Sequence, residues 1–170
     1  MPASNEAPAA SIVAKVRAAR RTVGIYMTGV GSRVDEKRTS MSGGGREAVH
    51  APQAPAAIGP YSHAVRAGGL LFCSGQIPLH PQTGELVGTS AAEQARQCLL
   101  NLSMVCEAAG VSLQQAVKVT VYMTDLSAFA EVGEVYASFF EHDPPARVAI
   151  GVAALPRGAQ VEIDAVVALS

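Results

Sequence analysis

Residues 74–78 place a hydroxyl group and a glycine at the end of an apolar run. Residues 70–73 (Leu-Leu-Phe-Cys) predict a strand, and Gly75 would let a ligand or another backbone approach closely. Pro78 then ends the ladder of hydrogen bonds, because it has no amide donor. The segment therefore fits either a ligand-contacting turn or an ordinary exit from a strand into a loop.

Arg147 is the cation best placed for substrate chemistry, because it begins a strand directly after Asp-Pro-Pro-Ala at 143–146. Its guanidinium group presents a rigid fork of donors that suits a carboxylate. Strand alternation puts Arg147, Ala149 and Gly151 on one face, where the two small residues would leave room for a ligand. Glu162 alternates away from its apolar neighbours and could reach that face. The two interpretations are a carboxylate-binding site and an Arg–Glu ion pair at the sheet edge.

Other reactive residue types form no motif of known chemistry. The four histidines are His50, His63, His80 and His142. They lack the spacing of metal ligands, so we expect neither a metal nor a cofactor. The glycines at 43–45 precede no strand-to-helix turn with a lysine, which excludes a phosphate-binding loop. The three cysteines are Cys73, Cys98 and Cys106. They lack a Cys-x-x-Cys arrangement, and we expect buried free thiols in a reducing cytoplasm.

Length and charge limit the classes of partner. The 170 residues suit one domain with an extension, and a domain of this size can bury a substantial core. The formal net charge is −1 and the isoelectric point is near 6.4. This balance argues against nucleic acid or an anionic membrane as the main partner. No apolar run approaches the length that crosses a bilayer.

The composition changes near residue 50. Residues 1–49 hold most of the lysines and arginines, the glycine run and no sustained apolar pattern. We therefore expect 1–49 to be a disordered extension and 50–170 to be the folded domain. Within the extension, residues 11–23 combine an apolar stripe at helical spacing with several arginines. A transit peptide is the alternative interpretation of this segment.

From residue 51 onwards the pattern predicts five strands and two helices. Gly68-Gly69 fits a two-residue hairpin turn. Ser90 and Glu93 have the capping-box spacing that begins a helix, and Gly110 ends it. Asp125 or Ser127 would cap the second helix, which runs to about residue 140. The predicted strands are 63–67, 70–74, 116–124, 147–153 and 161–167. The order is β-β-α-β-α-β-β, an α+β arrangement.

Two helices can cover only one face of such a sheet. The last strand nevertheless has apolar residues on both faces, with Val161 and Ile163 on one side and Val166 and Ala168 on the other. An uncovered apolar face needs a partner, so we expect a homo-oligomer in which sheets pack against one another.

Six segments, spread over the chain from about residue 47 to its end, together resemble the RidA (YjgF) family of enamine/imine deaminases. They are Ala-Pro-Ala-Ala-Ile-Gly-Pro-Tyr-Ser at 54–62, Ser-Gly-Gln-Ile-Pro at 74–78, Gln-Ala-Arg-Gln at 94–97, Val-Tyr-Met-Thr-Asp-Leu at 121–126, Pro-Ala-Arg at 145–147, and Leu-Pro at 155–156 ahead of Val-Glu-Ile-Asp at 161–164. The resemblance implies a chorismate-mutase-like fold, with two helices on one face of the sheet. It also implies a homotrimer with sites between subunits. The implied reaction is hydrolysis of 2-aminoacrylate or 2-iminobutanoate to a 2-keto acid and ammonia.

The resemblance also implies a role for each candidate residue. Arg147 would bind the substrate carboxylate, and Tyr61 would close over the substrate. Ser74 and the amide of Gly75 would make polar contacts with it. Glu162 would hold the attacking water, and we expect its carboxyl group to have a pKa near the ordinary value.

Three features depart from the family pattern. Ala149 stands where a cysteine is common, Gly133 stands where an asparagine is frequent, and the loop before Arg147 is short. A metabolite-binding or regulatory trimer without turnover is therefore an alternative function. Ribonuclease activity is a third, against which the near-neutral charge argues.

Overall fold

The structure is a computed structural model that describes residues 45–169. Its strands are β1 (Glu47–Val49), β2 (Ala64–Ala67), β3 (Leu70–Gln76), β4 (Ala116–Met123), β5 (Ala146–Gly151) and β6 (Val161–Ala168). Its α-helices are α2 (Ala91–Ala108) and α3 (Phe129–Phe139), and its 3-10 helices are η2 (Leu113–Gln115), η3 (Leu126–Ala128) and η4 (Pro156–Gly158). The predictions for residues 1–44, including the transit peptide, lie outside the described residues.

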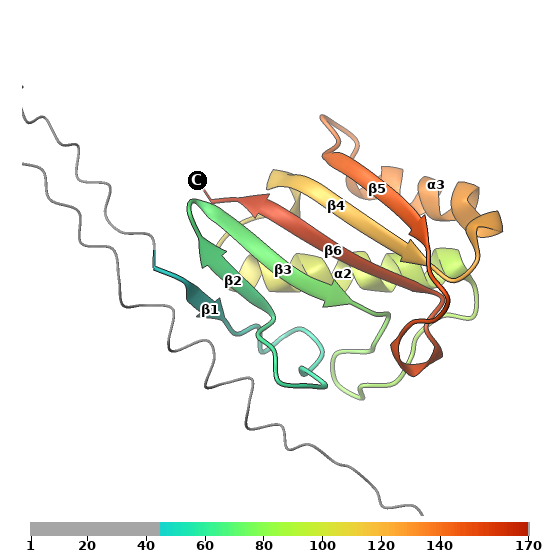
Figure 1. Cartoon of the computed structure of the whole chain (residues 1–170), viewed down its shortest axis with the longest axis horizontal. Helices are drawn as coiled ribbons and strands as arrows, with labels where there is room; N and C mark the ends of the chain where they lie inside the picture. Colours follow the sequence, from blue (N-terminus) through green and yellow to red (C-terminus); the bar gives the residue numbers. More distant parts are fainter. Residues whose placement is uncertain (1–44, 170) are drawn as a thin grey trace, which may run out of the picture. The chain divides into compact units, whose positions relative to one another are not determined.

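The strands form one mixed sheet in the order β1-β2-β3-β6-β4-β5 (Figure 1). All neighbours are antiparallel except β4 and β5, which are parallel and are connected through α3. The last strand of the chain, β6, lies between β3 and β4. This placement brings the end of β3 beside the start of β6, and the candidate site lies there.

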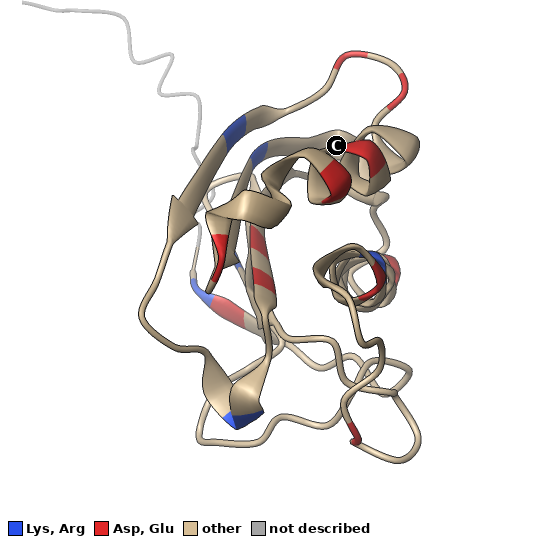
Figure 2. Cartoon of the chain, turned by 90° about the vertical axis from the view of Figure 1, so that its right-hand side faces the viewer, with Lys and Arg blue, Asp and Glu red and all other residues tan. Residues whose placement is uncertain are grey.

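Both helices lie on the same face of the sheet, as the side view in Figure 2 shows. α2 packs against β3, β6 and α3. The core between the helices and the sheet contains Leu71, Leu99, Leu102, Val119 and Ile163, all fully buried. The predicted α+β arrangement with two helices on one face is therefore confirmed.

Two local signals in the sequence form as predicted, whereas Asp125 caps the short helix η3 and not α3, which begins after Ala128 without a side-chain cap. Ser90 Oγ accepts a hydrogen bond from the Glu93 amide, and the Glu93 carboxylate accepts one from the Ser90 amide, each at 3.2 Å. Two amide groups at the start of α2 are satisfied in this way. Gly68 and Gly69 both have positive φ, at 58° and 78°, which is the conformation of a type I′ hairpin turn.

One prediction was incomplete: within residues 45–169 the sheet has six strands, not five. β1 pairs with the edge strand β2 and lies before the boundary at residue 50 that the composition indicated. A three-residue strand with two exposed side chains is too short to show a period of two. Backbone pairing holds it in place, and Arg66 adds an ion pair with Glu47 at 3.2 Å.

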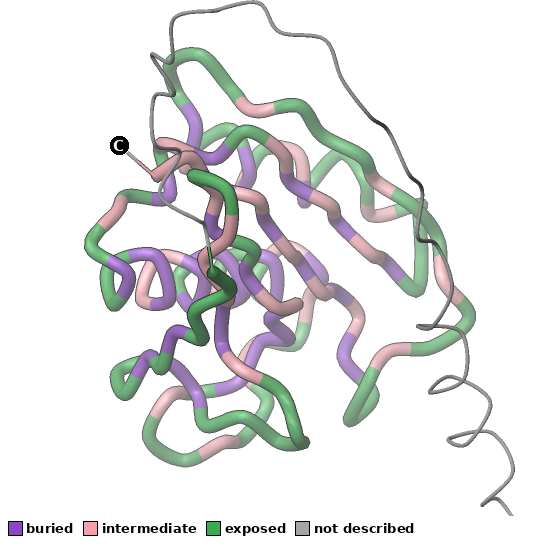
Figure 3. The backbone as a smooth tube through the Cα atoms, turned by 60° about the vertical axis from the view of Figure 1, so that its left-hand side comes forward, coloured by how far each residue is buried: buried purple, intermediate pink, exposed green. Residues whose placement is uncertain are grey.

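The face of the sheet opposite the helices carries apolar side chains that one copy of the chain leaves exposed. Phe72 is 45% exposed, and Val148 and Ile150 on β5 are 38% and 41% exposed. Buried and less buried residues alternate along β4 and β6 in Figure 3, because only alternate side chains meet the helices. The open face is thus partly apolar, as the sequence predicted.

Candidate functional site

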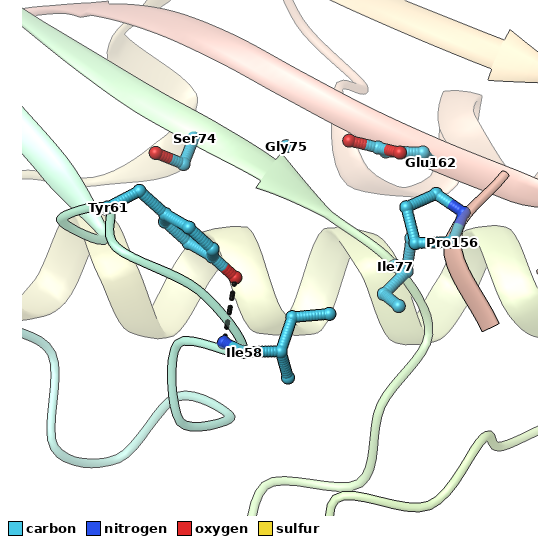
Figure 4. A pocket seen from close by; sticks show the side chains of 7 residues that line it. All are labelled: Ile58, Tyr61, Ser74, Gly75, Ile77, Pro156 and Glu162. Carbon is cyan, nitrogen blue, oxygen red and sulfur yellow. Dashed lines mark hydrogen bonds between the residues drawn. The ribbon is translucent and has the colours of Figure 1, made fainter. Parts of the chain in front are cut away.

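A cavity of about 250 Å³ lies where β3 ends and β6 begins. Its lining residues are Ile58, Tyr61, Ser74, Gly75, Ile77, Pro156 and Glu162 (Figure 4). Four of the five residues predicted for the site, Tyr61, Ser74, Gly75 and Glu162, are therefore brought together. The fifth, Arg147, does not line this cavity.

Ser74 and Gly75 occupy an irregularity in the pairing of β3 with β6. Cys73 pairs with Ala165 and Gln76 with Ile163, so two residues of β3 oppose Asp164 alone. Such a β-bulge bends the strand and redirects its side chains. The Ser74 hydroxyl donates a hydrogen bond to the Ser62 carbonyl at 2.7 Å, which ties the bulge to the loop before β2. Its oxygen atom keeps the capacity to accept a hydrogen bond.

Gly75 is a glycine because the side chain of Glu162 lies against its Cα. A Cβ atom at this position would clash with Glu162 Oε1 and lie 3.0 Å from Glu162 Cδ. Figure 4 shows the carboxyl group directed toward Gly75 from the neighbouring strand. The close approach that the sequence indicated at Gly75 is thus made by the acidic side chain of the site.

The pKa of Glu162 is raised, so the expectation of an ordinary pKa was wrong. Partial burial is the main cause, because it disfavours the charged form, and the negative charge of Asp164 is the second. Asp164 also accepts a hydrogen bond of 2.7 Å from the Tyr122 hydroxyl. That bond is the main cause of the raised pKa of Tyr122. A carboxyl group with a raised pKa is better suited to accept and return a proton near neutral pH.

Tyr61 and Ile58 form the wall of the cavity opposite Glu162. The Tyr61 hydroxyl accepts a hydrogen bond from the Ile58 amide at 3.3 Å, so the ring folds back over its own loop. Tyr61 remains 44% exposed, and Ile58 51%. This wall is therefore an accessible, largely apolar surface with one phenol group.

His63 fixes this loop, a role that the sequence analysis missed. The side chain is buried, its Nδ1 accepts a hydrogen bond from the Ala51 amide at 3.2 Å, and its Nε2 donates one to the Pro55 carbonyl at 2.9 Å. Because Nδ1 is an acceptor, the proton lies on Nε2. The isolated position of His63 predicts no such role, since its partners are backbone groups of a loop without a regular pattern.

Arg147 lies on the other face of the sheet from Glu162, so their predicted common face was wrong. Arg147 pairs in register with Val119, which points into the helix-covered core, while Glu162 pairs with Tyr122 on the open face. Side chains of directly paired residues share a face. The alternative of an Arg147–Glu162 ion pair within one chain is excluded by the same geometry.

The room expected beside Arg147 is also filled. Ala149 packs against the hydrophobic core, and a Cβ atom on Gly151 would lie 3.2 Å from the side chain of Leu126. The small size of Ala149 and Gly151 therefore leaves space for the hydrophobic core and for η3. The expected ligand space is found instead at the bulge of β3.

The three cysteines are buried and unpaired, as predicted. Burial is the main cause of the raised pKa of Cys98, and a hydrogen bond with Cys106 is the main cause for Cys73. Neither thiol is activated as a nucleophile.

Within residues 45–169 no group of three metal-binding side chains occurs. In the same range, no helix has the length and apolar character that spanning a membrane requires.

Comparison with known proteins identifies the class to which this fold and cavity belong. The family model described as "Endoribonuclease L-PSP" matches residues 51–169. The chain belongs to this family, the RidA (YjgF) family. Among its relatives, a RutC family protein of Sinorhizobium fredii is 50% identical over 73% of this chain and 98% of its own. The 2-iminobutanoate/2-iminopropanoate deaminase of Mus musculus is 45% identical over 71% of this chain and 90% of its own.

Solved structures agree with the fold. RidA from an Antarctic Psychrobacter species is 42% identical, with a TM-score of 0.70 over 72% of this chain and 99% of its own. TdcF of E. coli, solved with bound serine, is 40% identical, with a TM-score of 0.69 over 73% of this chain and 99% of its own. Members of the family therefore share this sheet-and-helix arrangement, and TdcF binds a small amino acid.

Proposed function

We propose that this chain hydrolyses reactive 2-imino acids, and their 2-enamine tautomers, to 2-keto acids and ammonia. The observation that carries the proposal is the Glu162 carboxyl group, held against Gly75 in a small cavity with a pKa raised by burial. Relatives that carry a deaminase name, and a bound serine in TdcF, support a small amino-acid-like ligand. The candidate substrates are 2-aminoacrylate and 2-iminobutanoate.

The reaction needs one acid–base group and good positioning. Glu162 in its ionised form takes a proton from a water molecule while the water oxygen forms a bond to C2 of the imine. The C=N π electrons move to nitrogen, which takes that proton back from Glu162 and gives a tetrahedral carbinolamine. Glu162 then accepts the proton of the carbinolamine hydroxyl group and passes it to the nitrogen as the C=O bond forms and the C–N bond breaks. A 2-keto acid and ammonia leave, and Glu162 is ionised again. Holding water and imine together makes attack effectively unimolecular.

The Ser74 hydroxyl oxygen and the Gly75 amide supply polar contacts in this proposal, and Tyr61 covers the substrate. No cofactor or metal takes part.

Carboxylate binding is assigned to Arg147, which lies away from the cavity in one chain. We therefore assign the complete site to a homotrimer, in which Arg147 of one copy reaches the cavity of the next. The exposed apolar side chains of the open face support such an assembly. The free buried thiols suit a reducing cytoplasm.

A binding or regulatory trimer without turnover is the second candidate. It is favoured by Ala149, whose side chain packs on the core and offers no thiol. It is also favoured by Gly133, beside which a side chain would have free space. In this case a 2-keto acid would bind in the same cavity, but imine hydrolysis would not be accelerated.

The deciding experiment generates imines in situ with an amino-acid oxidase or a dehydratase and follows keto-acid release. We expect acceleration by the chain and its loss in Glu162→Gln. Glu131→Gln is the matched control, since it changes an exposed carboxylate in the first turn of α3 that does not line the cavity. Keto-acid binding without acceleration would support the regulatory trimer. Cleavage of RNA that survives both Glu162→Gln and Arg147→Ala would not belong to this site.

A further inference from the structure

Arg147 is held by two aromatic rings of α3. Its Cζ atom lies 5.4 Å from the centroid of the Phe129 ring and 4.8 Å from that of Tyr136. The two rings are about two helical turns apart and lie on the same side of α3. Both distances fall within the range of a favourable cation–π contact.

This support leaves the donors of Arg147 available. A cation–π contact needs no N–H donor to be paired with an acceptor, whereas carboxylates bind the N–H groups of the guanidinium. Within residues 45–169, the Arg147 side chain makes neither a hydrogen bond nor an ion pair. An acidic partner would have fixed the side chain equally well but would have occupied the donors that a substrate needs.

The second ring is itself firmly placed. Tyr136 is 5% exposed, and its ring lies 4.7 Å from that of the buried Phe140. Its hydroxyl group is buried without a hydrogen-bond partner in the described part of the chain, and the contacts with Arg147 and Phe140 are made by its ring. Phe129, in contrast, is 43% exposed in the first turn of α3. Core packing does not explain an aromatic residue there, but contact with Arg147 does.

We propose that Phe129 and Tyr136 are positioning residues that orient the Arg147 guanidinium group for a substrate carboxylate. This inference rests on the proposed function, in which Arg147 binds that carboxylate. In this proposal the two rings restrict the orientation of the guanidinium group before the ligand arrives. The N–H groups of the guanidinium then bind the ligand. Less side-chain entropy is then lost on binding.

The first test needs no substrate. In the ligand-free protein, ¹⁵N relaxation of the Arg147 Nε–H group reports how far the side chain is ordered. We expect Phe129→Leu and Tyr136→Leu to make this group clearly more mobile, and Tyr136→Phe, which keeps the ring, to preserve its order. Phe139→Leu is the matched control, because that ring lies 6.0 Å from a different arginine, Arg96. Phe129 is exposed, so its substitution does not put folding at risk. If the Arg147 side chain is as ordered in Phe129→Leu as in the wild type, the proposal is overturned.

The second test measures the dissociation constant of 2-oxobutanoate by calorimetry. We expect Phe129→Leu to raise it about three- to tenfold, the factor that a partly exposed cation–π contact implies. In the Arg147→Ala background, Phe129→Leu should have no further effect, because it acts through the arginine. An equal effect in both backgrounds would overturn the positioning role. If Arg147→Ala alone leaves binding unchanged, the carboxylate assignment of the proposed function fails, and the relaxation measurement still decides whether the rings order Arg147.

Discussion

The side chain of Glu162 covers the Cα of Gly75, so that a methyl group there would clash with Glu162 Oε1 and lie 3.2 Å from Glu162 Cγ. The two residues come from β3 and β6, which are far apart in the chain and paired in the sheet. The β-bulge at Ser74 and Gly75 and the acidic side chain therefore form one structural unit. Substitution of Gly75 by a larger residue therefore displaces the carboxyl group of Glu162 directly.

Gly75→Ala is expected to displace the Glu162 carboxyl group while leaving the fold intact. Displacement of a reacting group by about 1 Å costs on the order of 100-fold in rate, so we expect kcat/KM for imine hydrolysis to fall about 10- to 100-fold. The thermal midpoint should change little, because the clashing atoms belong to the end of a flexible side chain. Gly45→Ala, with nothing within 4 Å of its Cβ, is the control. Full activity of Gly75→Ala would show that the position of Glu162 is not critical.

The raised pKa of Glu162 predicts a pH-dependent stability difference. Folding raises this pKa above its usual value near 4.5, so the folded state binds the proton more tightly than the unfolded state. The favourable contribution is complete below about pH 4.5 and is lost as the pH rises through the folded pKa. Glu162→Gln, which remains uncharged, should therefore match the wild type in acid and become the more stable protein toward pH 7. Urea denaturation across this range measures the difference, and a less stable variant at pH 7 would contradict the prediction.

The same group should govern the acid limb of the pH–rate profile. If Glu162 acts as the base, kcat/KM falls as the pH drops through its raised pKa. Asp164→Asn removes the nearby charge that contributes to this pKa but keeps an acceptor for the Tyr122 hydroxyl. We expect the acid limb of this variant to move to lower pH. If the acid limb of Asp164→Asn lies at the same pH as that of the wild type, a group other than Glu162 controls the pH–rate profile.

His63→Ala should loosen the loop that carries Ile58 and Tyr61. The substitution leaves a buried cavity and removes the partners of the Ala51 amide and the Pro55 carbonyl, which should cost about 2–4 kcal/mol of stability. We expect KM to rise more than kcat falls, because the loop forms the wall of the cavity. His63→Gln offers one acceptor and one donor and should recover part of both losses. His50→Ala, an exposed neighbour of the His63 ring at 5.2 Å, is the control.

Phe72→Glu tests the proposed assembly. Phe72 is exposed on the open face of the sheet, beside Val65 and Val166 on the flanking strands. A charge there should break a trimer formed through this face and abolish activity together with it. Leu100→Glu is the matched control, since Leu100 is 40% exposed on α2. Light scattering gives the oligomeric state, and an active monomer would contradict a site shared between subunits.

The amino-terminal extension provides a separate prediction. We expect a chain that starts at Met41 to fold, assemble and hydrolyse imines like the full chain. Thermal unfolding and light scattering of the shortened chain test this expectation. Loss of folding would show that the domain depends on the preceding residues.

The features that depend on neighbouring residues could be predicted from the chain without its fold. The Gly68-Gly69 turn, the capping box of Ser90 and Glu93, and the alternation along β4 follow from local backbone preferences and side-chain periods. The family resemblance added the identity of Tyr61, Ser74, Gly75 and Glu162, which the fold gathers around one cavity.

The pairing of distant segments, in contrast, is visible only in the folded chain. The insertion of β6 between β3 and β4, the β-bulge opposite Asp164, and the added strand β1 depend on backbone hydrogen bonds between segments far apart in the chain. The same pairing puts Arg147 and Glu162 on opposite faces, because register fixes the face of every side chain in a strand. A period of two in the sequence shows which residues share a face within one strand. It does not show which face of one strand matches which face of another.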